Sequence, residues 1–158
     1  MELERDEYAF ISAPCVPNAL NAPNAPNAPM KIDRFEDLDC WKEARKLVNM
    51  VYEAIRKSKE FQKDYRLKDQ SIGASVSVMG NITEGFVRRS NKEFIQFLFI
   101  SLSSAAELQS HMYVALDQNY ISDDQFHDIY HQTDKTLKMI SGLITYLRKN
   151  IEKPKRSK

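Results

Sequence analysis

The stretch Ser90–Ala115, SNKEFIQFLFISLSSAAELQSHMYVA, decides the fold, because its apolar and small residues recur with the period of an α-helix. One stripe advances in alternating steps of four and three residues: Phe94, Leu98, Ser101, Ala105, Leu108, Met112 and Ala115. Such steps place one residue per turn on a single seam, as in left-handed helix bundles. Ser90 followed by Glu93 forms a capping box, so we expect this helix to open at Ser90.

The same periodicity extends in both directions along the chain. We expect a first helix from near Asp37, a second over about 64–84, and a last helix that opens at Ser122 with Gln125 in a second capping box. The residues expected to face the core of these helices are Leu38, Trp41, Ala44, Val48, Val51, Tyr52 and Ile55; Leu67, Ala74, Ser75, Val78, Met79 and Ile82; and Phe126, Tyr130, Thr133, Leu137, Ile140, Ile144, Leu147 and Ile151. The last two helices are joined by residues 119–121 alone, so they must be antiparallel. The sequence therefore predicts an all-α, antiparallel up-down-up-down four-helix bundle over residues 30–151.

The two ends of the chain differ in composition from this body. Residues 14–29 repeat the unit Asn-Ala-Pro, and a proline at every third position prevents helix or sheet from propagating. We expect residues 1–29 to be a disordered extension, with Met30 as the native start or the extension dispensable. The chain has a net charge of +1, but residues 148–158 alone carry +5, so residues 152–158 are expected to be a basic tail.

Composition excludes several classes of protein. The chain is 42% hydrophobic and 28% charged, as in soluble globular proteins, and no apolar run reaches the roughly 20 residues of a membrane helix. The acidic N-terminus is unlike a secretory signal, so we expect a cytoplasmic protein without membrane contact. His127 and His131 are four residues apart, but they lie outside the seam and lack the glutamate of a metalloprotease motif. We expect no catalytic residue, cofactor or metal.

The third helix is apolar beyond its seam, which bears on assembly. Phe97, Phe99, Ile100 and Leu102 make the stretch FIQFLFISL apolar most of the way round. A lone four-helix bundle covers one stripe of each helix, and a helix that is apolar on all sides must be buried on all sides. We therefore expect these four residues to form an oligomer interface. The alternative is a helix that lies unusually deep in a monomer.

The stretch Asn81–Ser90, NITEGFVRRS, joins the second and third helices. Gly85 is expected to end the second helix in a left-handed conformation, because one glycine after a helix does not make a phosphate-binding loop. Asn81 and Glu84 are expected to be buried polar residues that fix the register of the bundle. Arg88 and Arg89 lie where an anion could be attracted; the alternative is that one of them pairs with Glu84 or Glu93.

These residues also carry a family resemblance. Asp69-Gln70, Ala74, Val76-Ser77-Val78 and Asn81-Ile82-x-Glu84-Gly85 resemble the signature of the small four helix bundle proteins, also called ribosomal RNA intervening-sequence proteins. RFEDLDCWKEARKLVNMVYE resembles their opening, SNKEFIQFLFISLSSAAEL resembles their third helix, and the likeness covers about residues 32–148. The resemblance implies a ring-like homopentamer. A distant relative is the basic pentameric accessory protein of diversity-generating retroelements, which binds a reverse transcriptase and nucleic acid.

One departure from the family pattern concerns nucleic acid. The family often has arginines at the positions of Ile72 and Gly73, and an Arg-Gly pair at those of Leu102 and Ser103, whereas all four residues are uncharged here. Because nucleic-acid affinity comes mainly from neutralising phosphates, these changes weaken that case.

Two main hypotheses of function follow. The first is a non-enzymatic oligomeric scaffold of the ribosomal RNA intervening-sequence type, whose partner docks on the ring. The second is an accessory protein that contacts RNA or DNA, in a ribosomal RNA or reverse-transcriptase complex, through basic residues of the ring: Arg88, Arg89, Arg148, Lys149, Lys153, Lys155 and Arg156. A third class, a metal-dependent enzyme, would require metal in the purified protein.

Overall fold

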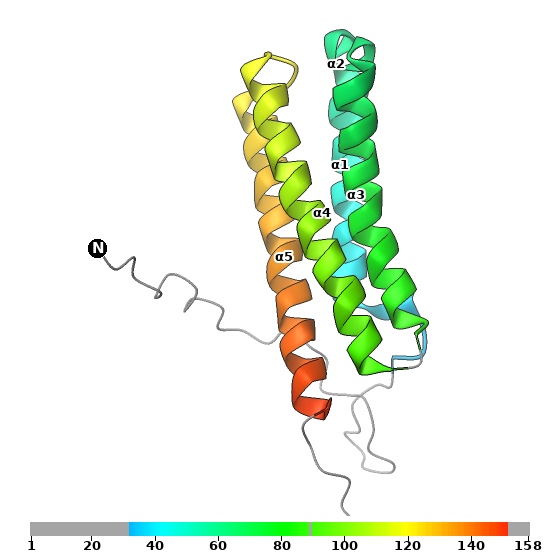
Figure 1. Cartoon of the computed structure of the whole chain (residues 1–158). Coiled ribbons are helices and arrows are strands. Elements are labelled where there is room, and N and C mark those ends of the chain that lie inside the picture. Colours follow the sequence, from blue (N-terminus) through cyan, green and yellow to red (C-terminus); the bar gives the residue numbers. More distant parts are fainter. Residues whose placement is uncertain (1–31, 89, 152–158) are drawn as a thin grey trace, which may run out of the picture.

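The computed structural model describes residues 32–88 and 90–151, and this part of the chain is all-α, without strands (Figure 1). The elements are a 3-10 turn, η1 (Phe35–Asp37), and five helices: α1 (Asp39–Lys57), α2 (Lys59–Lys63), α3 (Tyr65–Phe86), α4 (Asn91–Asp117) and α5 (Asp123–Ile151). Figure 1 shows α1, α3, α4 and α5 as four long rods lying side by side. The predicted all-α class is confirmed, whereas residues 1–29 and 152–158 lie outside the described residues.

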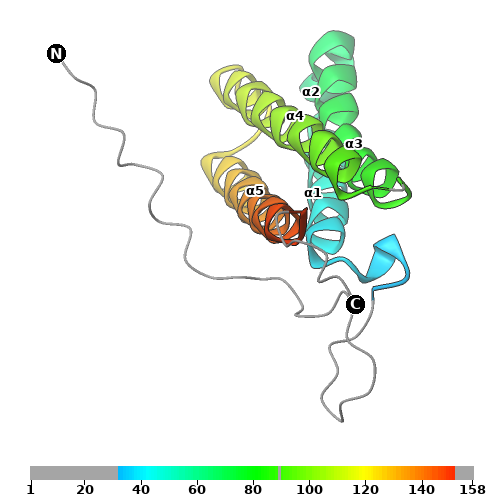
Figure 2. The same cartoon turned by 60° about the horizontal axis from the view of Figure 1, so that its bottom comes forward.

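The four long helices contact one another in a closed cycle, α1 with α3, α3 with α4, α4 with α5, and α5 with α1. Figure 2, in which the lower end of the bundle comes forward, shows the same arrangement. The core has two clusters. One lies around Leu98 and Ile140 towards the lower end of Figure 1, and the other lies around Leu108 and Phe61 towards the upper end. The α3–α4 contact is the most extensive, so these two helices form one surface of the molecule.

The seam predicted for α4 is confirmed, because all seven of its residues are buried. Two other core assignments are wrong: Tyr52 and Ile151 are exposed. In α1 the buried row passes through Leu47, Val51 and Ala54, which leaves Tyr52 turned away from it. Ile151 is the last residue of α5, at the end of the bundle.

The first long helix begins at Asp39, two residues after the start expected near Asp37. Phe35–Asp37 form the separate turn η1, and Leu38, in an extended conformation without a side-chain cap, precedes α1. A further helix, α2, follows a bend at Ser58, whose hydroxyl accepts a hydrogen bond from the Phe61 amide at 3.1 Å. Phe61 is fully buried and stacks on Tyr120 with the ring centroids 5.6 Å apart. This single turn therefore closes the upper end of the core.

Gly85 corrects another expectation, because it lies inside α3 and no described glycine has a positive φ. A Cβ atom built on Gly85 would lie 2.5 Å from Cδ2 of Phe94 and 2.9 Å from Cβ of Phe97. The residue is thus needed for the close approach of α3 and α4, and not for a left-handed turn. By contrast, a Cβ on Gly73, Gly80 or Gly142 would meet nothing within 4 Å.

The left-handed residue is instead Asn119, at φ 58°, in the connection between α4 and α5. The Tyr120 amide donates to the Ala115 carbonyl and the Asn119 amide donates to the Leu116 carbonyl, both at 2.8 Å. These two bonds define a Schellman motif, in which asparagine tolerates the left-handed conformation better than most residues. At the far side of the turn Ser122 and Gln125 form the predicted capping box, with bonds of 3.2 and 3.0 Å.

Candidate functional site

The outer surface of α4 is the most unusual surface of the described bundle. Between Phe94 and Leu116 the helix carries a single acidic residue, Glu107, and no lysine or arginine. Phe99 and Ile100 are 43% and 48% exposed, and Phe97 and Leu102 are half-buried. The four residues predicted as an oligomer interface thus all reach the surface to some extent.

α3 continues this surface, because residues 70–83 contain no charged side chain. Val76 is exposed, and on either side of it along the helix Gly73 and Gly80 carry no side chain and have open space beside them. Since α3 and α4 pack closely, their outer surfaces adjoin. We call the uncharged surface of residues 70–83 and 94–106 the α3–α4 face.

Polar bonds behind the α3–α4 face fix the register of its two helices. The Ser101 hydroxyl donates to the Val78 carbonyl at 2.8 Å, and the hydroxyls of Ser77 and Ser104 share a bond of 3.0 Å. Asn81 donates from Nδ2 to the hydroxyl and the carbonyl of Ser77, at 3.0 and 2.8 Å. Asn81 is only half-buried, but through Ser77 it belongs to a chain of bonds that crosses from α3 to α4.

Glu84 corrects the expectation of a second buried polar residue, because its side chain is half exposed. It forms an ion pair with Arg88 one turn further along the chain. The guanidinium of Arg88 also lies over the ring of Phe97, 4.6 Å from its centroid. The charge of Arg88 is therefore already engaged within the chain. Arg89 lies outside the described residues.

The basic residues at the end of α5 are only partly described. Arg148 is exposed, and its guanidinium lies 5.4 Å from the centroid of the Phe99 ring. Lys149 is exposed next to it, while Lys153, Lys155 and Arg156 lie outside the described residues. Two arginines, Arg88 and Arg148, thus lie over two phenylalanines of α4, one from the α3 side and one from α5.

A buried carboxylate, which the sequence reasoning missed, joins α1 to α5. The side chain of Glu43 is 9% exposed and accepts hydrogen bonds from Lys46, Lys135 and Gln132, at 2.6, 3.1 and 2.8 Å. Burial alone would raise the pKa of Glu43, but the hydrogen bonds from Gln132 and the two lysines outweigh it and lower the pKa to about 2. Its burial could have been expected from the sequence, because Glu43 lies in the same row of α1 as the buried residues Ala44 and Leu47.

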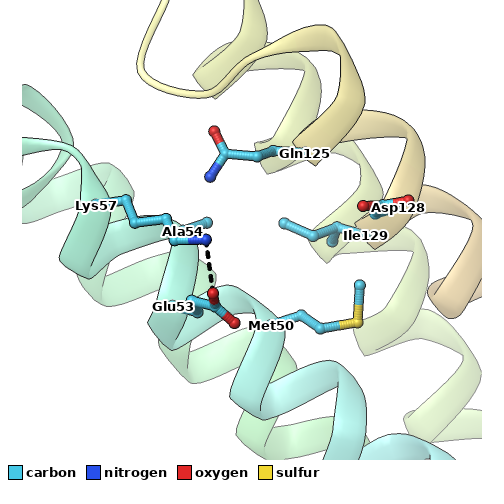
Figure 3. Close-up of a pocket in the computed structure, with 7 residues that line it drawn as sticks. All are labelled: Met50, Glu53, Ala54, Lys57, Gln125, Asp128 and Ile129. Atoms are coloured by element: carbon cyan, nitrogen blue, oxygen red, sulfur yellow. Dashed lines mark ion pairs between the residues drawn. The ribbon is translucent and has the colours of Figure 1, made fainter.

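Figure 3 shows a small pocket between α1 and α5 near the upper end of the bundle, with a volume of about 110 Å³. Its apolar side consists of Met50, Ala54 and Ile129, and the Glu53–Lys57 ion pair of 2.6 Å lies at its edge. The other lining residues are Gln125 and Asp128. The charges of Glu53 and Lys57 satisfy each other, so this pocket offers a ligand little beyond an apolar hollow.

No group of three or more histidine, cysteine, aspartate or glutamate side chains comes together in the described part of the chain to hold a metal ion. None of the helices described combines the length and apolar character needed to cross a membrane.

Comparisons with known proteins show a family and a similar fold. Residues 36–142 match the family model described as 23S rRNA-intervening sequence protein. A crystal structure of a protein of unknown function from the S23 ribosomal protein family of Bacteroides thetaiotaomicron is similar, with a TM-score of 0.56 and 23% identity. The match covers 66% of this chain and 94% of that chain, and at this identity it shows a shared fold. A search of curated proteins found no match.

Proposed function

Because the chain belongs to the 23S rRNA-intervening sequence protein family, we propose that it is a non-enzymatic scaffold that assembles through the α3–α4 face into a ring-like homopentamer. Each subunit would be an antiparallel up-down-up-down bundle to which the short helix α2 is added. The topology is supported by the short connections at Ser58, 87–90 and 118–122 between helices that pack on one another. The observation that carries the assembly is the exposure of Phe99 and Ile100 on a helix surface almost without charge.

Leaving the α3–α4 face exposed to water has a cost in free energy. Burying a large apolar side chain contributes about 1.5–3 kcal/mol, and Phe99 and Ile100 retain nearly half of their surface in the single chain. Monomeric proteins seldom leave contiguous apolar patches exposed on this scale. A second copy could cover both residues, and the charge it would meet beside them is the guanidinium of Arg148 over the Phe99 ring.

The shape of the α3–α4 face suits contact between copies of the chain. Phe99 and Ile100 are exposed on α4, whereas Gly73 and Gly80 leave space on the outer side of α3. Protruding and open parts thus lie on different helices, so α4 of one copy could pack on α3 of the next. Such a contact gives a dimer when it is two-fold and a ring when it is head-to-tail and the rotation permits closure; the ring in this proposal is what the family resemblance implies.

The test is the mass of the full chain in solution, by sedimentation equilibrium or light scattering. We expect about five times the 18.3 kDa of one chain. Ile100→Glu places a charge in the interface and should reduce the mass towards one chain, with the helical circular dichroism unchanged. Asn49→Glu, at an exposed position of α1, is the matched control and should keep the wild-type mass. A wild-type protein that stays single at high concentration would overturn the proposal.

A second candidate function is contact with RNA or DNA at the lower end of the bundle. It is favoured by Arg148 and Lys149, which are exposed beside Phe99, and by the basic sequence that follows them. The Glu84–Arg88 ion pair counts against it, because a paired arginine neutralises phosphate less readily. Steeply salt-dependent binding to ribosomal RNA or a generic duplex, reduced when the residues after Arg148 are removed, would support this role. Absence of binding at low salt would reject it.

A further inference from the structure

The α4–α5 hairpin has an unusual distribution of charge. Residues 93–134 contain seven acidic residues and no lysine or arginine, and the first basic residue after them is Lys135. The seven are Glu93, Glu107, Asp117, Asp123, Asp124, Asp128 and Asp134. This stretch covers nearly all of α4 and the first turns of α5, so the connection between the two helices is strongly negative.

Tyrosine rings lie on the same surface. Tyr113 is 49% exposed, and its ring centroid lies 5.8 Å from that of Tyr130 and 4.8 Å from that of the buried Phe126. Gln109 of α4 donates from Nε2 to Oδ1 of Asp134 on α5 at 2.8 Å. These contacts join the two helices along this side of the hairpin, with Tyr113 at its surface.

Helix geometry places the carboxylates beside these rings. Asp123, Tyr130 and Asp134 follow one another by seven and four residues, which puts them on one face of α5. Asp117 follows Tyr113 by four residues on α4, so it lies one turn closer to the connection. Burial, together with the neighbouring Tyr113 and the carboxylate of Asp134, raises the pKa of Tyr130. We call these five residues the tyrosine–aspartate face.

This face differs from an ordinary solvated helix surface. On α1 the acids are followed one turn later by lysines that pair with them, as in Asp39–Lys42 and Glu53–Lys57. Within residues 32–88 and 90–151, by contrast, none of the three aspartates of the tyrosine–aspartate face forms an ion pair with lysine or arginine. Unpaired acids around an exposed aromatic ring leave the cation to be supplied from outside.

We propose that the tyrosine–aspartate face binds an arginine-rich segment of another protein. A guanidinium would stack on the exposed ring of Tyr113 and donate hydrogen bonds to the carboxylates of Asp117 and Asp123. Arginine suits the site better than lysine because it is planar, stacks on rings and pairs with carboxylates through two bonds. The complementary charges would also speed the encounter of the two partners.

The basic segment of this chain does not fit as the occupant within one molecule. Tyr130 lies 21 residues before Ile151 along α5, or roughly 32 Å at the helical rise. Residues 152–158 lie within seven residues of Ile151, and even a fully extended chain spans only about 25 Å over that length. In a ring of parallel subunits the same segment of every neighbour would lie at the same far end. The partner is therefore a different protein.

The experiment uses the full chain and a fluorescent synthetic peptide of alternating arginine and glycine, with binding followed by anisotropy at low and at physiological salt. We expect binding that weakens about tenfold over this range of salt. The peptide with lysine in place of arginine should bind about three- to tenfold more weakly. Equal binding of the two peptides would overturn the assignment of the Tyr113 ring as a stacking platform.

Substitutions test whether the arginine peptide binds at the tyrosine–aspartate face. Tyr113→Ser, and the double variant Asp117→Asn with Asp123→Asn, should each weaken it about fivefold or more, with unchanged helical circular dichroism. The matched control is Glu60→Gln with Asp69→Asn, which removes two exposed acids elsewhere. Equal loss in the control would mean a response to net charge alone and would overturn the proposal. Self-association that is lost both in Tyr113→Ser and on removal of residues 152–158 would also overturn it, because a second copy would then occupy the face.

Discussion

α1 and α4 differ in the charge of their surfaces. Along α1, Asp39, Glu43 and Glu53 each pair with a lysine one turn later, and the helix is joined to α5 through the buried carboxylate of Glu43. α4 has one charged residue between Phe94 and Leu116 and is joined to α3 through an apolar seam and the close contact at Gly85. The difference is that the surface of α1 carries paired charges suited to water, whereas the surface of α4 is almost uncharged, which supports the proposal that α4 contacts another protein surface.

The largest effect should come from the contact that seats α4 on α3. Gly85→Ala places a methyl group against Phe94 and Phe97, so it should reduce the free energy of unfolding by about 1–3 kcal/mol. Gly80→Ala, in the same helix but with open space around it, should raise that free energy by about 0.5–1 kcal/mol. Urea unfolding of both variants checks the pair. Equal effects would mean that the helices do not approach closely at Gly85.

A smaller effect is expected where α1 is joined to α5. Glu43→Gln removes a charge that two lysines and Gln132 stabilise, and it should cost about 1–2 kcal/mol at neutral pH. The folded pKa of about 2 lies below the ordinary value of 4.5, so this stabilisation is present above pH 4.5 and is lost as the pH falls towards 2. Unfolding measured against pH should show an acid-induced loss that is weaker in the variant. Parallel curves for the two proteins would contradict the lowered pKa.

The ends of the two helices provide the next test. α1 passes into α2 through a bend, whereas α4 reverses through the left-handed Asn119. Asn119→Ala should cost about 1 kcal/mol because alanine tolerates that conformation poorly, and Asn119→Gly should be neutral or stabilising. Thermal unfolding followed by circular dichroism distinguishes the two variants. An alanine variant as stable as the glycine variant would show that Asn119 is not left-handed.

The smallest effect belongs to the exposed pairs of α1. Glu53→Gln breaks the ion pair with Lys57, in which both side chains are more than half exposed, so its effect on the free energy of unfolding should be the smallest of the series. High salt should remove even this difference. A loss of stability as large as that of Glu43→Gln in the same unfolding assay would contradict this prediction. It would mean that the exposed ion pairs of α1 stabilise the fold as much as its buried contact with α5.

Features that depend on the periodicity of the sequence could be predicted from it. The seam of α4 followed from its regular steps, and the caps at Ser90 and Ser122 followed from residue type. Gly85 was misread because a glycine near the end of a helix is often left-handed, and only the packed structure reveals Phe94 and Phe97 beside it. α2 was missed because one helical turn carries too few residues to display a period.

The candidate surface was predicted only in part. The excess of apolar residues on α4 pointed to Phe99 and Ile100, but the contribution of α3 needed the two helices to be placed side by side. The position of Glu43 beside Ala44 and Leu47 indicated burial, but its partner Gln132 is 89 residues away in sequence. Bonds between such distant positions leave no local pattern to read.

The segregation of charge along the α4–α5 hairpin gives this hairpin an electric dipole along its length. Near a polyanion such a rod experiences a torque that turns the Arg148 end inwards before any contact forms. Subunits gathered on that polyanion would all point Tyr113 outwards, into the solution. The orientation would fade once dissolved ions shorten the reach of the field to about 8 Å.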